Sequence, residues 1–336
     1  MLVSETKTMH IGITYDLRSE YLAMGFSEDE TAEFDRDDTI TAIENTLRAL
    51  GHTPERIGHL KQLAAALVAG KRWDLVFNIA EGMYGIGREA QVPALLDAYR
   101  IPYTFSDPLV MSLTLDKGMT KRVLRDAGVP TSDFFVAARA EDAARVHFAP
   151  PYFIKPVAEG TGKGITPASI VRDREKLAAG VAGLLAAYRQ PVLVEPYLSG
   201  REFTVGIVGS GDKARALGSM EIILLGRAEQ GVYSYVNKEN CEELVEYRVA
   251  LAANDPLVAE SERIALAAWR VLGCRDGGRI DIRCDGEGRP QFMEVNPLAG
   301  IHPEHSDLPI ICTKMQIPYR QLIEEIVASA ATRVGR

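Results

Sequence analysis

Residues 279–297 read RIDIRCDGEGRPQFMEVNP, and this stretch predicts a β-hairpin with an acid-bearing face. Period-2 alternation sends Arg279 and Asp281 to one side of the first strand, and Glu294 and Asn296 to one side of the second. A turn centred between positions 287 and 288 places Asp281 opposite Glu294 and Arg279 opposite Asn296. Facing carboxylates repel, so this register indicates a divalent cation between them, and ligands that are all oxygen favour magnesium or manganese over zinc. The alternative that this segment leaves open is a solvated hairpin face with incidental acids.

The chain has 336 residues, which predicts two or three domains with a cleft between them. A formal net charge of −8 and a pI near 5.4 argue against sequence-independent binding to nucleic acid or to an anionic membrane, because both need a basic surface. The longest apolar stretches, such as 264–272, are shorter than the about 20 residues that cross a bilayer. Met1–His10 carries charged residues where a signal peptide is apolar, so we expect a flexible leader there. The four cysteines have no CxxC or zinc spacing, which predicts free thiols and a cytoplasmic protein.

The first third of the chain alternates short apolar runs with amphipathic segments, which predicts a doubly wound α/β domain over residues 1–106. We expect strands over 10–16, 74–79 and 101–104, and helices over 39–50 and 90–99. In such domains ligands lie off the carboxyl ends of the strands, where this chain carries Tyr15-Asp16 and Glu81-Gly82. The acid-rich segment 18–38 between them is expected to be a solvated helix-loop insertion and not a site.

The pattern changes after Ser106. A helix is expected over 116–127, because Gly128 and Pro130 follow it as a stop. Later periodic segments predict strands over 152–157, 192–197, 202–208 and 216–225, and helices over 175–188, 255–272 and 319–331. We divide this part of the chain into a central subdomain, 107–194, and a C-terminal subdomain, 195–336, which contains the hairpin.

Residues 154–165 read IKPVAEGTGKGI, a strand that runs into a glycine-rich loop bearing a lysine. The backbone amides of such a loop can wrap phosphate oxygens, since glycines tolerate tight conformations. It is not a Walker P-loop, because Lys163 is followed by Gly164 and not by Ser or Thr. Lys117 opens the helix of the same subdomain, so Lys117 and Lys155 can meet on a triphosphate from two directions. A mobile hairpin turn and ordinary surface lysines are the alternatives.

Residues 192–204 read VLVEPYLSGREFT, an apolar strand that ends in an acid, a proline, an aromatic residue and a glycine before a strand resumes. This pattern is typical of a hinge between two lobes. Such a hinge can offer backbone groups to an adenine edge, and Glu202 to ribose hydroxyls, within a mostly apolar pocket. The alternative is a simple hairpin corner with Tyr197 in the core.

In this order the motifs resemble those of the D-alanine–D-alanine ligases of the ATP-grasp superfamily, from about residue 74 to residue 327. The resemblance implies an α/β (α+β) ATP-grasp fold, in which the N-terminal α/β subdomain is followed by two α+β subdomains that enclose ATP. It also implies two magnesium ions, with manganese as the substitute, and a homodimer. The motifs that carry it are Asn78-Ile-Ala-Glu-Gly82, Ile101-Pro-Tyr-Thr104, Leu115-Asp-Lys117, Ile154-Lys-Pro156, Glu159-Gly-Thr-Gly162, Glu195-Pro-Tyr-Leu-Ser-Gly-Arg-Glu202-Phe-Thr-Val205, and Gly278 to Pro297.

By position, the resemblance implies a role for each matching residue. Arg279 would steady an acyl phosphate, and the Gly300 amide would form the oxyanion hole. The lid-like segment 233–240 would close over the site and exclude water. The implied metal ligands are Asp281, Glu294 and Asn296, and the implied nucleotide contacts are Lys117, Lys155, Gly160, Thr161, Gly162, Glu195, Tyr197, Leu198, Glu202 and Lys238.

The chain departs from the family mainly in the pocket for the first substrate. The family's Gly-Gly-x-Ser-x-Glu loop is here Gly12 to Arg18, its His-Gly pair is Glu81-Gly82, and its Glu-Asp pair is replaced by Arg88-Glu89. In the lid, Glu239 replaces the family's tyrosine after the lysine. Asp16 or Glu81 can therefore hold an ammonium, and Arg88 an extra carboxylate of a larger substrate, with ordinary ion pairs as the alternative.

A last candidate site follows the hairpin, where residues 300–306 read GIHPEHS. Pro303 lies inside the HxxH pattern, so a zinc site is not expected. By resemblance, His302 and Ser306 would lie at the carboxylate of the acceptor amino acid. We therefore expect an ATP-dependent carboxylate–amine ligase with a substrate pair other than two D-alanines. A genuine D-alanine–D-alanine ligase and an inactive nucleotide-binding regulatory protein are the alternatives.

Overall fold

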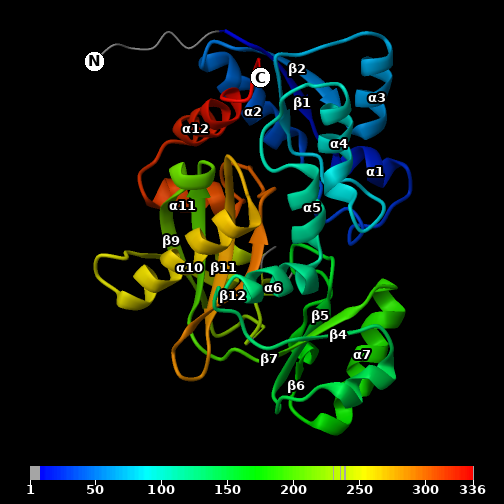
Figure 1. Cartoon of the computed structure of the whole chain (residues 1–336), viewed down its shortest axis with the longest axis vertical. Helices are drawn as coiled ribbons and strands as arrows, with labels where there is room; N and C mark the ends of the chain where they lie inside the picture. Colours follow the sequence, from blue (N-terminus) through cyan, green and yellow to red (C-terminus); the bar gives the residue numbers. More distant parts are fainter. Residues whose placement is uncertain (1–7, 230, 235, 238–239, 336) are drawn as a thin grey trace.

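The computed structural model describes residues 8–229, 231–234, 236–237 and 240–335. Three sheets, each with its own helices, follow one another along the chain, and Figure 1 shows the central one set apart below the other two. The cores of the N-terminal and C-terminal sheets meet in one hydrophobic cluster, to which the last helix contributes Leu322, Ile323 and Ile326.

The N-terminal domain has a parallel three-stranded sheet in the order β2-β1-β3. Its strands are β1 (His10–Thr14), β2 (Thr53–Gly58) and β3 (Leu75–Asn78). Its helices are α1 (Arg18–Ala23), α2 (Asp37–Ala49), α3 (Leu60–Val68) and α4 (Gln91–Ala98), and the 3-10 turn η1 (Arg88–Ala90) precedes α4. The parallel order confirms the predicted doubly wound arrangement, although β2 and α3 were not predicted individually.

The strand predicted over 101–104 is wrong. Only an isolated bridge joins Tyr103 to Val76, although Ile101 and Tyr103 are buried as expected. The physical reason lies at its two ends, where Arg100 and Phe105 adopt positive φ angles of 55° and 70°. These left-handed residues bend the chain out of the extended conformation that a ladder requires.

The central subdomain has an antiparallel four-stranded sheet in the order β4-β7-β5-β6. Helices α5 (Pro108–Leu115) and α6 (Lys117–Asp126) lead into it from the N-terminal domain. The long helix α7 (Arg174–Tyr188) covers the sheet with Leu177 and Val181. The strands are β4 (Phe135–Ala137), β5 (Tyr152–Pro156), β6 (Ile170–Val171) and β7 (Val192–Pro196), with 3-10 turns η2 (Ala140–Arg145) and η3 (Pro167–Ser169).

The C-terminal subdomain has an antiparallel five-stranded sheet in the order β10-β9-β8-β11-β12. Helix α10 (Pro256–Leu272) packs on it through Trp269, which is fully buried. The remaining elements are β8 (Glu202–Val208), η4 (Gly211–Lys213), β9 (Arg215–Leu224), α9 (Cys241–Leu244), β10 (Val245–Ala250), β11 (Gly277–Cys284), β12 (Pro290–Asn296), α11 (Asp307–Lys314) and α12 (Tyr319–Ala331). Helix α12 returns to the N-terminal domain and packs against α2, so the two ends of the chain share one core.

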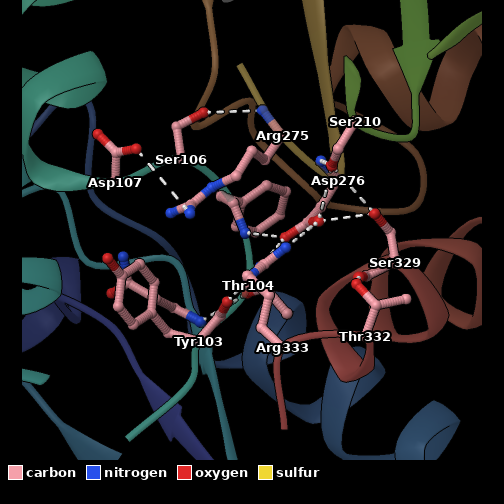
Figure 2. Close-up of polar contacts among 12 residues, drawn as sticks. Tyr103, Thr104, Ser106, Asp107, Ser210, Arg275, Asp276, Ser329, Thr332 and Arg333 are labelled. Carbon is pink, nitrogen blue, oxygen red and sulfur yellow. Dashed lines mark hydrogen bonds and ion pairs between the residues drawn. The ribbon is translucent and has the colours of Figure 1, made fainter. Parts of the chain in front are cut away.

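A buried carboxylate joins these parts (Figure 2). Asp276 is fully buried, and one of its oxygens accepts the backbone N–H of Phe105 at 2.8 Å. Arg333, just after α12, donates to both oxygens of Asp276 at 2.9 and 2.5 Å, and Ser329 donates to one of them at 2.7 Å. Arg333 also donates to the carbonyl of Tyr103 at 2.6 Å, so the last turn of the chain ties the N-terminal domain to β11.

No helix among the described residues has the length and apolarity needed to cross a membrane. The cysteines whose side chains are described, Cys274, Cys284 and Cys312, are free and buried, as the sequence predicts for structural thiols.

Candidate functional site

The β11–β12 hairpin has the predicted register where the acids lie. Arg279 pairs with Asn296 and Asp281 pairs with Glu294. A bulge follows Asp281, so that Ile282 pairs with Phe292 and the turn is one residue tighter than a regular ladder would give. The carboxylates of Asp281 and Glu294 both line one cavity, which confirms that they share a face.

Neighbouring side chains hold Asp281 and Arg279 of this face. Asp281 accepts a hydrogen bond from Thr204 on β8 at 2.9 Å, and its other oxygen pairs with Arg279. Arg279 also lies 3.5 Å from Asp307, at the start of α11. Burial opposes the charge of Arg279, but Asp281 and Asp307 raise the pKa of its guanidinium, so it stays cationic.

The two predicted lysines approach this face from the central subdomain. Lys117 Nζ lies 3.6 Å from the carboxylate of Glu294 and donates to the carbonyl of Glu159 at 2.5 Å. Lys155 Nζ lies 3.3 Å from Glu195 on β7, and both lysines line the cavity of Asp281 and Glu294. Burial works against the charged form of Lys155, yet Glu195 and Glu294 raise the pKa of its ammonium. Lysines and acids from two subdomains therefore meet in one place.

An apolar pocket adjoins this cavity at the hinge between β7 and β8. Tyr197 and Leu198 line it together with Phe153 and Met293. The hydroxyl of Tyr197 donates to the carbonyl of Gly231 at 3.0 Å, and Arg283 Nη1 lies 3.1 Å from Glu202. The lining combines aromatic and apolar side chains with the charged Glu195 and Arg283, a composition that suits a planar heteroaromatic ring.

The glycine-rich loop lies over the cavity of the lysines. Gly160 and Gly162 accept backbone hydrogen bonds from Lys163 and Ile165 at 2.9 and 3.0 Å, so the loop is two consecutive turns. Thr161 and Gly162 have positive φ angles of 53° and 77°, the left-handed conformation that such tight turns require. Gly162 and Lys163 line the cavity itself.

A cavity of about 120 Å³ lies between the N-terminal domain and the hairpin. Its N-terminal wall carries Glu33, Glu81 and Glu89, and its opposite wall carries Lys117 and Arg279. Burial, followed by the charges of Glu89 and Glu33, raises the pKa of Glu81 well above its usual range. Burial raises the pKa of Glu89 to about 7. Such carboxylates gain most from a cationic group placed among them.

A more open cavity of about 420 Å³ lies on the other side of Arg279. Gly300 and Ser306 line it, as do Arg36 and Tyr233. Ser306 Oγ accepts a hydrogen bond from the backbone N–H of His302 at 2.9 Å, which folds the 300–306 segment into a compact turn. His302 Nδ1 in turn accepts the N–H groups of Glu304 and His305 at 3.1 Å, so that nitrogen is used within the loop.

Two predicted substrate residues have partners inside the protein. Asp16 is buried, and its oxygens accept the hydroxyl of Tyr21 and the N–H of Gly82, so Glu81 is the proposed ammonium partner that lines the cavity. Arg88 pairs with Glu33 at 2.9 Å, which is the ordinary ion pair held as its alternative. Lys238 and Glu239 lie outside the described residues.

The expectation that segment 18–38 is only a solvated insertion is wrong. Thr31 and Phe34 are buried, and Tyr21 packs on Phe34 with ring centroids 4.5 Å apart. The segment thereby places Glu33 at the smaller cavity and Arg36 at the larger one. Its acidic composition hid this role, because solvated and buried acids look alike in sequence.

Other site residues were also missed. Arg283 lies two positions after Asp281 on the same strand face, so the period-2 pattern contained a signal for it. Lys121 is fully buried and pairs with Glu195, and its signal was a position one turn after Lys117 on α6. Phe153 and Met293 carried no signal that separates them from core residues.

Solved structures share this whole architecture. The D-alanine–D-alanine ligase from Bacillus anthracis complexed with ATP has a TM-score of 0.70 and 22% identity, over 97% of this chain and 98% of that one. The VanG D-Ala:D-Ser ligase from Enterococcus faecalis has a TM-score of 0.72 and 18% identity, over 96% of this chain and 100% of that one. These likenesses show that the chain has the fold of these ligases.

Sequence relatives give further evidence about the family of this chain. The family model described as D-ala D-ala ligase C-terminus matches residues 123–328. A D-alanine–D-alanine ligase of Bordetella petrii is 33% identical, over 82% of this chain and 80% of its own length. A D-alanine–D-alanine ligase of Aquifex aeolicus is 32% identical, over 85% of this chain and 92% of its own length. The chain therefore belongs to the D-alanine–D-alanine ligase-like ATP-grasp family, and it is an ADP-forming ligase.

Proposed function

We propose that this protein uses ATP to activate the carboxylate of an amino acid and joins it to an amine, with a substrate pair other than two D-alanines. The observation that supports this most is the row of adjoining cavities. An apolar pocket, a lysine- and acid-lined cavity, a small acidic cavity and a larger open cavity follow one another past Arg279. They match, in order, an adenine, phosphates, a donor and an acceptor.

The nucleotide would lie along the first two cavities. Glu195, Tyr197 and Leu198 would meet the adenine, and Glu202 the ribose. Lys117 and Lys155 would neutralise phosphate oxygens from two sides, as their positions in one cavity allow. The amides of the turn Gly160-Thr161-Gly162 would bind the same phosphates, with Lys238 assigned to them by family likeness alone.

The hairpin would hold the metal. Asp281 and Glu294 face each other, and Asn296 would offer its side-chain carbonyl oxygen as a third ligand. The amide nitrogen of Asn296 is buried without a partner among the described residues, and it is a donor that a phosphate oxygen would satisfy. Three or more His, Cys, Asp or Glu side chains do not gather into a ligand set in the described ranges, which fits an ion that takes its other ligands from phosphates. Magnesium, as two ions, or manganese would supply charge neutralisation between the phosphates.

The chemistry then follows from charge. A donor carboxylate oxygen attacks the γ-phosphorus of ATP, forming an O–P bond as the bond to ADP breaks. The lysines and Arg279 reduce the repulsion that opposes this approach. The amine attacks the resulting acyl phosphate, a C–N bond forms, phosphate leaves, and the amine loses its proton. Arg279 and the Gly300 amide would stabilise the oxyanion.

The substrate assignments rest on the two further cavities. Glu81, more than Asp16, would hold the donor's ammonium, since it lines the small cavity. Ser306 would meet the acceptor's carboxylate, with His302 shaping the same turn. Arg88 is assigned to an extra carboxylate only if its pair with Glu33 opens. We also keep a cytoplasmic homodimer as a proposal, which sedimentation of the purified chain would test.

The second candidate is a genuine D-alanine–D-alanine ligase. It is favoured by the names of the sequence relatives. The donor cavity favours another substrate, because Glu81 stands where the family has histidine and Arg88 stands where it has glutamate.

A panel experiment separates the two candidates. The enzyme is incubated with ATP, magnesium and single or paired D- and L-amino acids, and products are identified by mass together with released phosphate. We expect a product other than D-alanyl-D-alanine to form fastest. A D-alanine dipeptide as the main product would refute our preference, and no phosphate with any amino acid would refute the activity itself.

A further inference from the structure

Glu33 occupies an unusual position, because one carboxylate joins two domains. Its Oε1 accepts the backbone N–H of Gly160 at 2.6 Å, across 127 residues of sequence. Its Oε2 accepts from Arg88 at 2.9 Å, and both side chains expose only 10% of their surface. Arg88 also donates to the carbonyl of Ala158 at 3.0 Å. The N-terminal domain therefore contacts the glycine-rich loop on both sides of Glu159, at Ala158 and at Gly160.

The charge of this contact is well supported. Burial opposes ionisation of Glu33, but Arg88 and Lys163 lower the pKa of its carboxyl, so it stays ionised. A charged acceptor makes the hydrogen bond from Gly160 stronger than a neutral one would. The loop also has anchors of its own, since Gln190 accepts from Ala158 N–H at 2.6 Å and Lys163 pairs with Glu159 at 2.8 Å.

Glu33 packs so closely against Gly160 that a larger residue would not fit at position 160. A Cβ atom added at Gly160 would lie 2.5 Å from Oε1 of Glu33. The carboxylate therefore meets the backbone of the loop directly, next to Thr161 and Gly162. Glu33 also lines the small cavity assigned to the donor.

We infer that Glu33 is a positioning residue, which holds the glycine-rich loop in the conformation that binds the nucleotide's phosphates. It does so from the N-terminal domain, with Arg88 as its partner. This inference rests on the proposed function, since it assumes that the nucleotide's phosphates bind under the loop. The contact costs no binding energy at the moment of phosphate capture, because the loop is already ordered.

The test compares Glu33→Ala with Glu30→Gln in the full chain. Glu30 lies in the same segment and hydrogen-bonds to Ser27, and its charge also acts on Lys163, so its variant removes a nearby charge while it leaves the Gly160 contact in place. Calorimetry measures affinity for the magnesium complex of a non-hydrolysable ATP analogue and, separately, for adenosine. We expect Glu33→Ala to lower the affinity for the analogue by about tenfold or more, which is the effect of losing one charged hydrogen bond. The affinity for adenosine should not change. Glu30→Gln should match the unmodified protein for both.

Two further measurements exclude a merely structural effect. Amide hydrogen exchange over residues 158–164 should rise in Glu33→Ala and not in Glu30→Gln. Gly160→Ala should break the same contact from the loop side, so the double variant should lose little more affinity than either single one. Equal affinity of Glu33→Ala and the unmodified protein for the analogue would overturn the inference. Tighter binding by Glu33→Ala would overturn it too, since Glu33 would then compete with phosphate. Failure of the unmodified protein to bind the analogue would instead refute the proposed nucleotide site.

Discussion

Glu294 and Asp281 are the residues on which the proposed chemistry depends most. Their opposition was predicted from the alternation of residues 279–297, because strand geometry is local and the turn is short. Their partners Thr204 and Lys117 were beyond that local pattern, since they come from β8 and α6. Sequence thus predicted which side chains face each other and not what surrounds them.

Replacement of Glu294 by Gln should abolish most magnesium-dependent activity. A metal contributes several kcal/mol to the transition state, so the loss of one carboxylate ligand should lower kcat about 100-fold. Phosphate release measured over a range of magnesium concentrations checks this. The control is Glu287→Gln in the exposed hairpin turn, which should keep full activity. Unchanged kcat and magnesium dependence in Glu294→Gln would contradict the metal assignment.

Glu89 should make stability depend on pH. Its pKa is raised from 4.5 to about 7 by burial, so the folded state binds its proton more tightly than the unfolded state does. Its contribution is therefore complete below about pH 4.5 and is lost as the pH rises through about 7. Urea unfolding is measured between pH 5 and pH 8. As the pH rises, the free energy of unfolding should fall less in Glu89→Gln than in the unmodified protein. Parallel curves for the two proteins would show that Glu89 titrates normally.

At the scale of elements, most helices and strands were predicted within a residue or two. Strand β8 and helix α12 have the predicted bounds, and α7 and α10 differ by one residue at their starts. Long periodic segments were predictable because the spacing of their apolar residues shows which face is buried. The strand predicted over 101–104 is interrupted by left-handed residues, and β2, β4 and β6 are too short or too polar to show a period. Strand β10 and helices α3, α5, α9 and α11 were not predicted either.

Gly278 lies where the hairpin packs closely against helix α10, so a larger residue at this position tests that packing. A Cβ atom there would lie 2.5 Å from the carbonyl of Asn296 and 2.7 Å from the ring of Trp269. Neither group can move far, so Gly278→Ala should lower the free energy of unfolding by about 1–3 kcal/mol and weaken magnesium dependence by displacing Asn296. Urea unfolding and magnesium titration measure the two effects. Gly286→Ala is the control, since its nearest atom would be 3.6 Å away, and an equal loss in both variants would refute this explanation.

At the scale of the whole molecule, Asp276 and Arg333 hold the N-terminal domain, β11 and α12 together (Figure 2). Removal of Arg333 would leave a fully buried carboxylate without its cation, which costs about 3–5 kcal/mol. We expect Arg333→Ala to lower the free energy of unfolding by about 3 kcal/mol, measured by urea unfolding. Arg320→Ala, at an exposed position near the start of α12, should have little effect. A loss below about 1 kcal/mol would mean that the serines alone satisfy Asp276.

The sequence by itself determined the hairpin register, the order of the motifs and the long helices, since each depends on neighbours within a few residues or on a strict period. Only the tertiary structure decided that segment 18–38 contributes Glu33 and Arg36 to the site, and that Arg88 faces Glu33. The physical reason is that these contacts join residues from separate domains, such as Glu33 and Gly160. The sequence does not distinguish an acidic residue that is solvated from one that accepts a backbone hydrogen bond. Domain packing alone decides which of the two occurs.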